Sequence, residues 1–342
     1  MPLPPATFAP ARRQRGRFVN PSGRGAQGLP SVLRWLATRR RGAWPSSVAD
    51  VHVAPPLPRL DDGSIRATIV GHATVLVQVG GLNFLTDPVL SKRIGPASWL
   101  GPKRVRPPAV PFEEIPKIDV VLLSHDHYDH LDRPTLARLA RRDDPLVIAG
   151  LEVGAKVPSR RVLELDWWQT HQLSARTRVT FVPSEHFSGR GPFDRDRRLW
   201  GGFVVETAAG TFYFAGDTAE GAHFAAVRER FGPMTLSLLP IGAYLPRWFM
   251  APVHIDPAGA LQASLALESQ VSLAIHYATF DLADEGYDAP PRELARALEQ
   301  LQGEPPGSDF RVVPFGEATV VARPGPAPAP DSTPAVAVLE AR

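Results

Sequence analysis

The sequence lacks cysteine altogether among its 342 residues. Disulfides and thiolate ligands are therefore excluded, and any metal ion must be held by imidazole and carboxylate groups. The chain also lacks any run close to the roughly 20 apolar residues that a transmembrane helix needs. Its N-terminus has no apolar core followed by a small-residue cleavage site, as a secretory signal would. We therefore expect a cytoplasmic protein whose membrane contact, where it exists, is peripheral and at the inner face of the membrane.

Acidic residues are absent from residues 1–49, which contain nine arginines. Because the whole chain has a formal net charge of +3, the remainder is net negative. A basic segment rich in Pro and Gly is most often a solvated leader, although it can also contact anionic lipid headgroups or nucleic acid. We predict a basic, largely disordered N-terminal arm (1–50), a folded domain (51–322) and a disordered tail rich in Pro and Ala (323–342).

The rest of the chain has the composition of a globular protein, with 44% hydrophobic and 21% charged residues. Short apolar runs alternate with amphipathic segments, which predicts an α/β fold of two sheets packed face to face with helices outside. We expect strands over 65–70, 74–79, 82–86, 119–124, 145–150, 162–166, 179–184, 201–206, 211–216, 236–242 and 271–276. We expect helices over 134–141, 220–231, 257–268 and 291–301.

The densest chemical signal is the motif SHDHYDHLD at 124–132, directly after an apolar strand run. In an extended segment, residues two apart point the same way, so His125 and His127 can reach one metal ion. Asp129 and His130 would then face a second ion. A lone histidine is usually structural, but three imidazoles and a carboxylate buried together without a cation would leave polar groups unsatisfied. The motif therefore predicts a site for zinc or a similar metal.

Three further candidates, His186, Asp217 and His276, also follow apolar strand runs. Two zinc ions need six or seven protein ligands and one open position for water, and this set brings the ligands to seven. We predict that His186 completes the first site, that His276 completes the second, and that Asp217 bridges two Zn²⁺ ions per chain.

These residues and their flanking stretches resemble the metallo-β-lactamase superfamily and, within it, the N-acylphosphatidylethanolamine-hydrolysing phospholipase D family. The similar stretches, in order, are GHATVLV (71–77), FLTDPV (84–89), GPKR (101–104), LSHDHYDHLD (123–132), ELDWW (164–168), FAGDT (214–218), IGAYLPRWFM (241–250), HIDP (254–257) and AIHYATF (274–280). The resemblance implies an αββα sandwich of two mixed sheets with a dizinc site at one edge. It also implies a phosphoric diester hydrolase that converts N-acylated ethanolamine phospholipids to phosphatidic acid and an N-acylethanolamine through a hydroxide bridging two zinc ions.

Three residues are assigned catalytic roles. Asp129 would hold metal and orient the attacking hydroxide, while Asp217 would fix the spacing of the ions for an in-line displacement. The resemblance places His254 near the active site, where it would support a ligand or touch substrate. His72 is equally consistent with a hydrogen bond to the site and with a purely structural one.

Six residues are assigned to substrate binding: Ser98, Trp99, Arg190, Tyr244, Trp248 and Phe249. The first two replace a Gln-Tyr pair of the phospholipase family. Gly189 replaces a basic residue of that family, which leaves Arg190 as the nearest cation. The segment with Trp248 and Phe249 can accept acyl chains or dip into a membrane surface, or it can pack as an ordinary loop.

Other substrates and functions are also consistent with the motif, because a fold does not by itself define a reaction. A lactone or a soluble or nucleic-acid phosphodiester could use the same metals. A nuclease that uses the arginines as a phosphate tether is disfavoured, because the arm has few aromatic residues besides Phe18 and Trp35 and no recognition motif. Nucleic acid is therefore not an expected partner.

A catalytically silent scaffold is disfavoured because all seven ligands are present. The expected partners are a phospholipid substrate and an anionic membrane surface; the oligomeric state is not predicted, and a dimer remains open.

Overall fold

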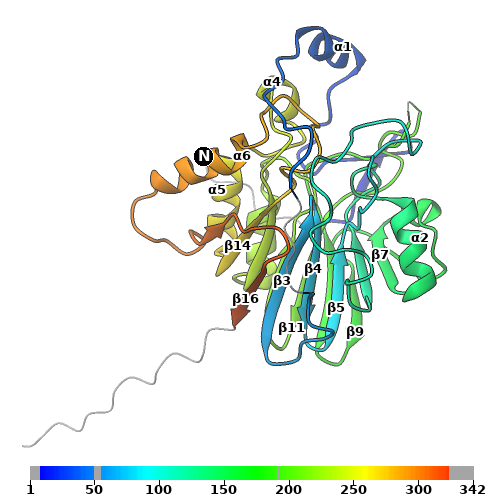
Figure 1. The fold of residues 1–342 in the computed structure, drawn as a ribbon, viewed down its shortest axis with the longest axis vertical. Helices are drawn as coiled ribbons and strands as arrows, with labels where there is room; N and C mark the ends of the chain where they lie inside the picture. The colour runs from blue at the N-terminus through cyan, green and yellow to red at the C-terminus, as the bar shows by residue number, and fades with distance from the viewer. Residues whose placement is uncertain (1–7, 50–54, 192, 323–342) are drawn as a thin grey trace, which may run out of the picture.

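The computed structural model describes residues 8–49, 55–191 and 193–322, which form two seven-stranded mixed sheets (Figure 1). The first sheet has the order β16 (Ala318–Ala322), β3 (Ser64–Gly71), β4 (Thr74–Val79), β5 (Leu82–Thr86), β6 (Val120–Leu123), β7 (Leu146–Gly150) and β8 (Val162–Leu165). The second has the order β15 (Phe310–Arg311), β14 (Val271–Ile275), β13 (Leu236–Pro240), β12 (Gly210–Phe214), β11 (Gly202–Thr207), β10 (Thr177–Val182) and β9 (Thr170–Ser174).

Helices cover the outer faces of both sheets, which completes the predicted αββα sandwich. Helix α2 (Arg133–Arg142) lies to the right in Figure 1 and buries Leu136 and Leu139 against the first sheet. On the other side, α5 contacts β13, and two further helices pack against α5. These three helices are α3 (His223–Phe231), α5 (Pro257–Leu267) and α6 (Ala289–Glu299). In the part of the chain that the structure describes, none of the helices has the length and apolar character needed to cross a bilayer.

The core lies between the sheets and also beneath α2. Along β4, Val75 and Val77 face the second sheet, whereas Leu76 between them faces the cluster under α2. All three side chains are fully buried. Alternate residues of a strand point to opposite faces, so a strand buried on both faces needs an almost continuous apolar run. This requirement explains why the apolar runs of the sequence predict the strands β3 to β7 of this sheet so closely.

A two-residue turn, Gly80-Gly81, joins β4 to β5. Gly80 and Gly81 both have positive φ, at 56° and 72°, and the two flanking strands pair antiparallel. A two-residue hairpin turn with positive φ at both positions is the type that strongly favours glycine.

Residues 8–49 depart from the predicted disordered arm. They form a hairpin of β1 (Arg12–Gln14) and β2 (Arg17–Val19), followed by α1 (Leu29–Thr38). Phe18 is buried in the main core, and Arg39 makes a 2.9 Å ion pair with Asp284. The arm is ordered because Phe18 is buried against the domain and because three of its arginines, Arg13, Arg39 and Arg41, form ion pairs with acidic residues there. The predictions for residues 1–7, for residue 50 and for the tail over 323–342 lie outside the described residues.

The strands that carry the predicted ligands end at the same edge. In the first sheet, β3 and β5 are parallel because both pair antiparallel with β4, and β6 is parallel to β5. In the second sheet, β10 and β12 are parallel because both pair antiparallel with β11. Strand β14 has the same direction because β12 pairs parallel with β13, and β13 pairs parallel with β14. The loops after these six strands therefore gather at one end of the sandwich, where α1 and α4 (Arg247–Met250) also lie (top of Figure 1).

Candidate metal centre

Three histidines form the first group of ligand atoms. Nδ1 of His127 lies 2.9 Å from Nε2 of His125 and 3.3 Å from Nε2 of His186. The first two come from the loop after β6 and the third from the loop after β10, so both sheets contribute. The three nitrogens lie within 4.8 Å of one another, as ligands of a single ion must.

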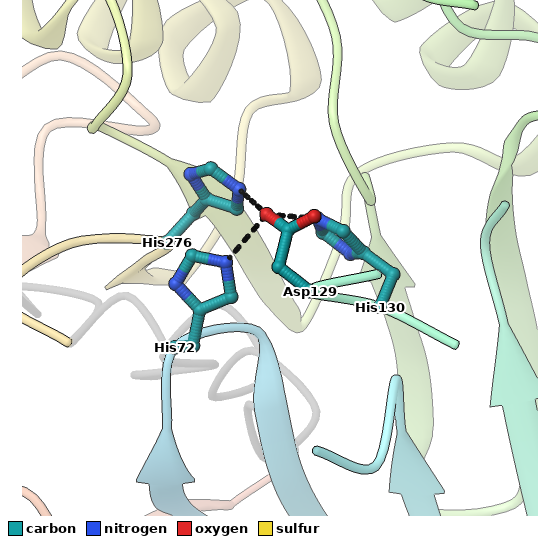
Figure 2. Close-up of side chains that lie close together, drawn as sticks. All are labelled: His72, Asp129, His130 and His276. Carbon is teal, nitrogen blue, oxygen red and sulfur yellow. Dashed lines mark hydrogen bonds and ion pairs between the residues drawn. The ribbon is translucent and has the colours of Figure 1, made fainter. Parts of the chain in front are cut away.

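A second group surrounds the carboxylate of Asp129. Nε2 of His130 and Nε2 of His276 each lie 3.4 Å from its Oδ2 atom. Nε2 of His72 lies 3.1 Å from the same oxygen. Figure 2 shows these three imidazoles converging on the carboxylate from different segments of the chain. His72 is thus part of the site, which resolves the choice that the sequence leaves open.

Asp217 lies between the two groups, where the sequence predicts a bridging ligand. Its Oδ2 atom is 3.2 Å from Nε2 of His130 and 3.6 Å from Nε2 of His186. Its Oδ1 atom is 3.2 Å from Nε2 of His276. One buried carboxylate thus faces histidines of both groups, and the seven predicted ligands come together.

Asp87 supports both groups, and the sequence analysis did not assign it a role. Its Oδ2 atom lies 2.6 Å from Nδ1 of His130 and accepts a 2.5 Å hydrogen bond from Oγ of Ser124. That hydroxyl lies 2.9 Å from Nδ1 of His125. Such partners fix the ring orientation of metal-binding histidines. Asp87 directly follows an apolar strand run, so the rule that identified the other ligands could have found it.

Burial keeps the histidines of the first group neutral, which is the form that binds metal. It lowers the pKa of His127 to about 4 and that of His186 to about 3, and it holds the pKa of His125 well below the usual range. Nδ1 of His186 also lies 2.7 Å from the carbonyl oxygen of Val253, which directs Nε2 toward the other two rings. The group is therefore arranged to donate three nitrogen lone pairs.

The second group favours positive charge. Burial alone would lower the pKa of His276, but the negative charge of Asp217 outweighs it and raises that pKa to about 9. In the opposite sense, burial would raise the pKa of Asp217, but the positive charges of His130 and His276 hold it well below the usual range. In this group the carboxylates stabilise protons on buried imidazoles, and a metal cation that binds there can replace those protons.

Several buried polar atoms of the site lie close to one another without forming a well-aligned hydrogen bond among the described residues. They include Nε2 of His130, Nε2 of His276 and Oδ1 of Asp217. Leaving a buried polar atom unpaired costs about 1–3 kcal/mol, so several at one place require an explanation. Metal cations satisfy these atoms, and imidazole and carboxylate are the donors that suit zinc and similar ions. The residues therefore fit a metal centre.

A cavity of about 350 Å³ opens onto this centre. His127, Asp129 and Asp217 line its polar side, and His254 lies at the same end, with Nδ1 4.0 Å from Oδ2 of Asp217. The other walls are mainly apolar and come from α1, α4 and nearby loops: Val32, Trp35, Phe187, Ala243, Phe249, Met250, Val253 and Leu282. A substrate with a polar reacting group and an apolar part fits such a cavity.

The predicted substrate residues of the 241–250 stretch lie in different places. Phe249 lines the cavity and stacks on Trp35 with ring centroids 4.9 Å apart. Trp248 faces outward, with the guanidinium of Arg34 4.6 Å from its ring centroid. Tyr244 is fully buried and does not line the cavity.

The other three predicted substrate residues do not reach this cavity. Ser98 and Arg190 line a separate cavity on the other side of residues 124–132, which we call the metal-binding loop, and Trp99 is 75% exposed. Sequence order alone does not show which face of a loop a side chain occupies, so the predicted substrate residues include residues that line two different cavities.

Comparison with known proteins relates this geometry to a family. Residues 82–277 match the family model described as the beta-lactamase superfamily domain. N-acyl-phosphatidylethanolamine-hydrolyzing phospholipase D 1 of Caenorhabditis elegans is 35% identical over 270 residues, which cover 75% of this chain and 76% of that protein. A metal-dependent hydrolase of Pyrobaculum aerophilum is 28% identical over 66% of this chain and 92% of its own length. The structure of the metallo hydrolase Igni18 from Ignicoccus hospitalis shares the fold, with a TM-score of 0.58, 21% identity, and coverage of 76% of this chain and 100% of Igni18.

Proposed function

The chain belongs to the metallo-β-lactamase superfamily of metal-dependent hydrolases, and we propose that it hydrolyses the phosphodiester of N-acylated ethanolamine phospholipids. The products would be phosphatidic acid and an N-acylethanolamine. The similarity to the nematode phospholipase supports this substrate class. The observation that carries the proposal is the amphipathic lining of the 350 Å³ cavity. Its polar end faces the metal centre, and its walls along α1 and α4 are apolar.

The cavity matches an amphiphile better than the alternative substrates. A phosphodiester placed at Asp129 and Asp217 would direct attached acyl chains along the wall formed by Trp35, Phe249 and Leu282. Small-molecule sites are typically apolar with a few convergent polar groups. A nucleotide or a small lactone would leave much of this apolar wall without a partner.

The outer face of α1 supports contact with a membrane. Leu29, Leu33 and Leu36 are 68%, 58% and 54% exposed, and their spacing puts them on one side of the helix. Trp248, exposed on α4, lies beside this helix, with its ring under the guanidinium of Arg34 from α1. An exposed apolar stripe with nearby cations is the pattern of a helix that lies in the interface of an anionic membrane. Lipid would then enter the cavity directly from the bilayer beside α1.

The seven ligands would hold two zinc ions, which supply Lewis acidity and a nucleophile at neutral pH when bound. Asp217 spans the two groups and fixes their separation. Asp129, held by three histidines, orients the attacking water toward phosphorus. Water adds to phosphorus, the bond from phosphorus to the ethanolamine oxygen breaks, and that oxygen takes up a proton. His254 faces the cavity beside Asp217, where it contacts the phosphodiester or supports His186.

The direct test is a substrate panel with purified, zinc-loaded protein. N-acylphosphatidylethanolamine, phosphatidylcholine, a lactone and single-stranded RNA are incubated separately, and the products are identified by mass spectrometry. We expect phosphatidic acid and N-acylethanolamine from the first substrate and at most slow turnover of the others. Asp217→Ala serves as the matched inactive control. Preferred turnover of the lactone or the RNA would overturn the proposed substrate class.

A further inference from the structure

A second cavity, of about 730 Å³, lies beside the metal-binding loop and is lined by the first residues of α2, the helix at the right of Figure 1. Its walls include the loop of residues 91–98 and residues 131–134. Five cationic side chains line it, and we refer to it as the basic cavity: Lys92, Arg93, Arg133, Lys156 and Arg190. The proposed hydrolysis at the metal centre does not use it.

The two carboxylates of the basic cavity are already engaged. Asp132 accepts hydrogen bonds from Oγ of Ser91 at 2.9 Å and from Oγ1 of Thr135 at 2.5 Å. Asp194 accepts from the backbone N–H of Arg190 at 3.0 Å and forms an ion pair with Arg198.

The cations of the cavity, by contrast, lack anionic partners. Among the residues that the structure describes, no carboxylate lies within ion-pair distance of Lys92, Arg133 or Lys156. Burial, together with the positive charge of Arg133, lowers the pKa of Arg190. Unpaired cations that converge on one cavity indicate a site for an anion.

Exposed apolar side chains flank the basic cavity. Trp99, next to the lining residue Ser98, is 75% exposed, and Phe193, between the lining residues Gly191 and Asp194, is 81% exposed. Large exposed apolar residues beside a charged pocket mark interaction sites. Aromatic side chains with cations are typical of the headgroup region of a bilayer. The surroundings therefore favour a phosphate that belongs to a lipid over one that is free in solution.

The basic cavity also contacts the metal-binding loop. The guanidinium of Arg190 donates hydrogen bonds to the carbonyl oxygens of Asp126 at 2.7 Å and Leu131 at 2.9 Å. It lies 3.9 Å from the ring centroid of Tyr128. An anion in the basic cavity would thus contact Arg190, the side chain whose hydrogen bonds hold the metal-binding loop in place.

We propose that the basic cavity binds the phosphate headgroup of an anionic phospholipid, as a second site separate from the metal centre. The proposal goes beyond the hydrolytic function and is tested by binding without turnover. A negative result in this binding test is therefore distinguishable from a failure of the protein to hydrolyse the proposed substrate.

The test measures the binding of full-length, zinc-loaded protein to vesicles of phosphatidylcholine with and without phosphatidic acid. The double variant Lys92→Ala/Lys156→Ala removes two cations of the cavity. The control Lys117→Ala/Arg176→Ala removes two exposed cations elsewhere, so the net charge of the two proteins is the same. Zinc content and thermal unfolding, measured for both, show that each variant is folded.

We expect the cavity variant to lose about tenfold or more of its affinity for phosphatidic acid vesicles, because each basic residue near an anionic membrane contributes about fivefold. The control should change by less than about twofold, since its cations lie away from the cavity. Equal losses in both variants, or no loss in either, would overturn the proposal. A titration with inorganic phosphate separates the two sources of this group. If the cavity variant loses phosphate binding but keeps its affinity for vesicles, the site takes free phosphate and the lipid assignment is wrong.

Discussion

The carboxamide of Asn20 forms two hydrogen bonds with the backbone of His186. Its Nδ2 atom donates to the carbonyl oxygen of His186 at 2.8 Å, and the backbone N–H of His186 donates to its Oδ1 atom at 3.0 Å. Nε1 of Trp200 donates to the same Oδ1 atom at 2.9 Å. All three residues are buried. A side chain from the N-terminal segment therefore positions a predicted metal ligand 166 residues away in the sequence.

We expect Asn20→Ala to weaken metal binding as well as folding. The change leaves the buried backbone N–H and C=O of His186 unpaired, each at a cost of about 1–3 kcal/mol, whereas Nε1 of Trp200 keeps its hydrogen bond to the carbonyl oxygen of Ser184. Loss of a residue that positions a ligand typically lowers metal affinity by about 10 to 100-fold. The measurement is zinc affinity by chelator competition, together with thermal unfolding. Gln14→Ala, on the exposed strand β1, is the control. Unchanged zinc affinity in a folded Asn20→Ala protein would contradict this role.

A related consequence concerns truncation. Because Phe18 and Asn20 are built into the core, removal of residues 1–49 should reduce turnover of vesicles and of detergent-dispersed substrate alike. A solvated leader would affect only the vesicle assay. Retention of full activity on detergent-dispersed substrate would show that the segment is dispensable for the fold.

The metal count tests the seven-ligand assignment. Purified protein should hold close to two zinc equivalents per chain after reconstitution, measured by elemental analysis, as the two-group geometry predicts. Asp217→Ala should lower this number, because its carboxylate faces both groups. One equivalent or none in intact wild-type protein would rule out a dinuclear centre.

Substitutions at Asp129 and His254 should have different effects on kcat when the two variants are compared at equal zinc occupancy. Asp129→Asn should lose about 100-fold or more in kcat, because the carboxylate both holds metal and orients the attacking water. His254→Ala should keep its zinc and lose about 10 to 100-fold, since it lies 4.0 Å from Asp217 and lines the cavity. Near wild-type turnover by Asp129→Asn would remove the orienting role. Loss of zinc from His254→Ala would make that residue a ligand.

The apolar face of α1 should affect only turnover at a membrane. Leu33→Ser/Leu36→Ser should reduce activity on anionic vesicles by about tenfold or more, because each buried leucine contributes about 1.5–3 kcal/mol of transfer free energy. Activity on detergent-dispersed substrate should stay nearly unchanged. Leu57→Ser, at another exposed leucine, is the control. An equal loss in both assays would mean that these leucines stabilise the fold and do not bind lipid.

Much of the fold and the ligand set can be predicted because both depend on local pattern. Strands buried on both faces produce uninterrupted apolar runs, and parallel strands of a sheet end at one edge. His186, Asp217 and His276 therefore stand out by position as well as by residue type. Asp87 follows the same rule and could have been assigned with them.

The parts that the sequence analysis missed depend on contacts between distant segments. Helix α4 and strands β15 and β16 are short or lie at sheet edges, so they carry little periodic signal. The N-terminal segment resembles a disordered leader by composition, and its order depends on single contacts such as that of Asn20 with His186. The separation of Ser98 and Arg190 from the metal cavity likewise depends on which face of a loop each side chain occupies.

The central claim is hydrolysis by attack on phosphorus at a metal centre that both sheets build. The most direct measurement is turnover of N-acylphosphatidylethanolamine in ¹⁸O-labelled water, with mass spectrometry of both products. Attack at phosphorus predicts one ¹⁸O atom in the phosphate of phosphatidic acid and none in the N-acylethanolamine. Label in the N-acylethanolamine, or in a released fatty acid, would contradict the account, because the water would then have attacked carbon.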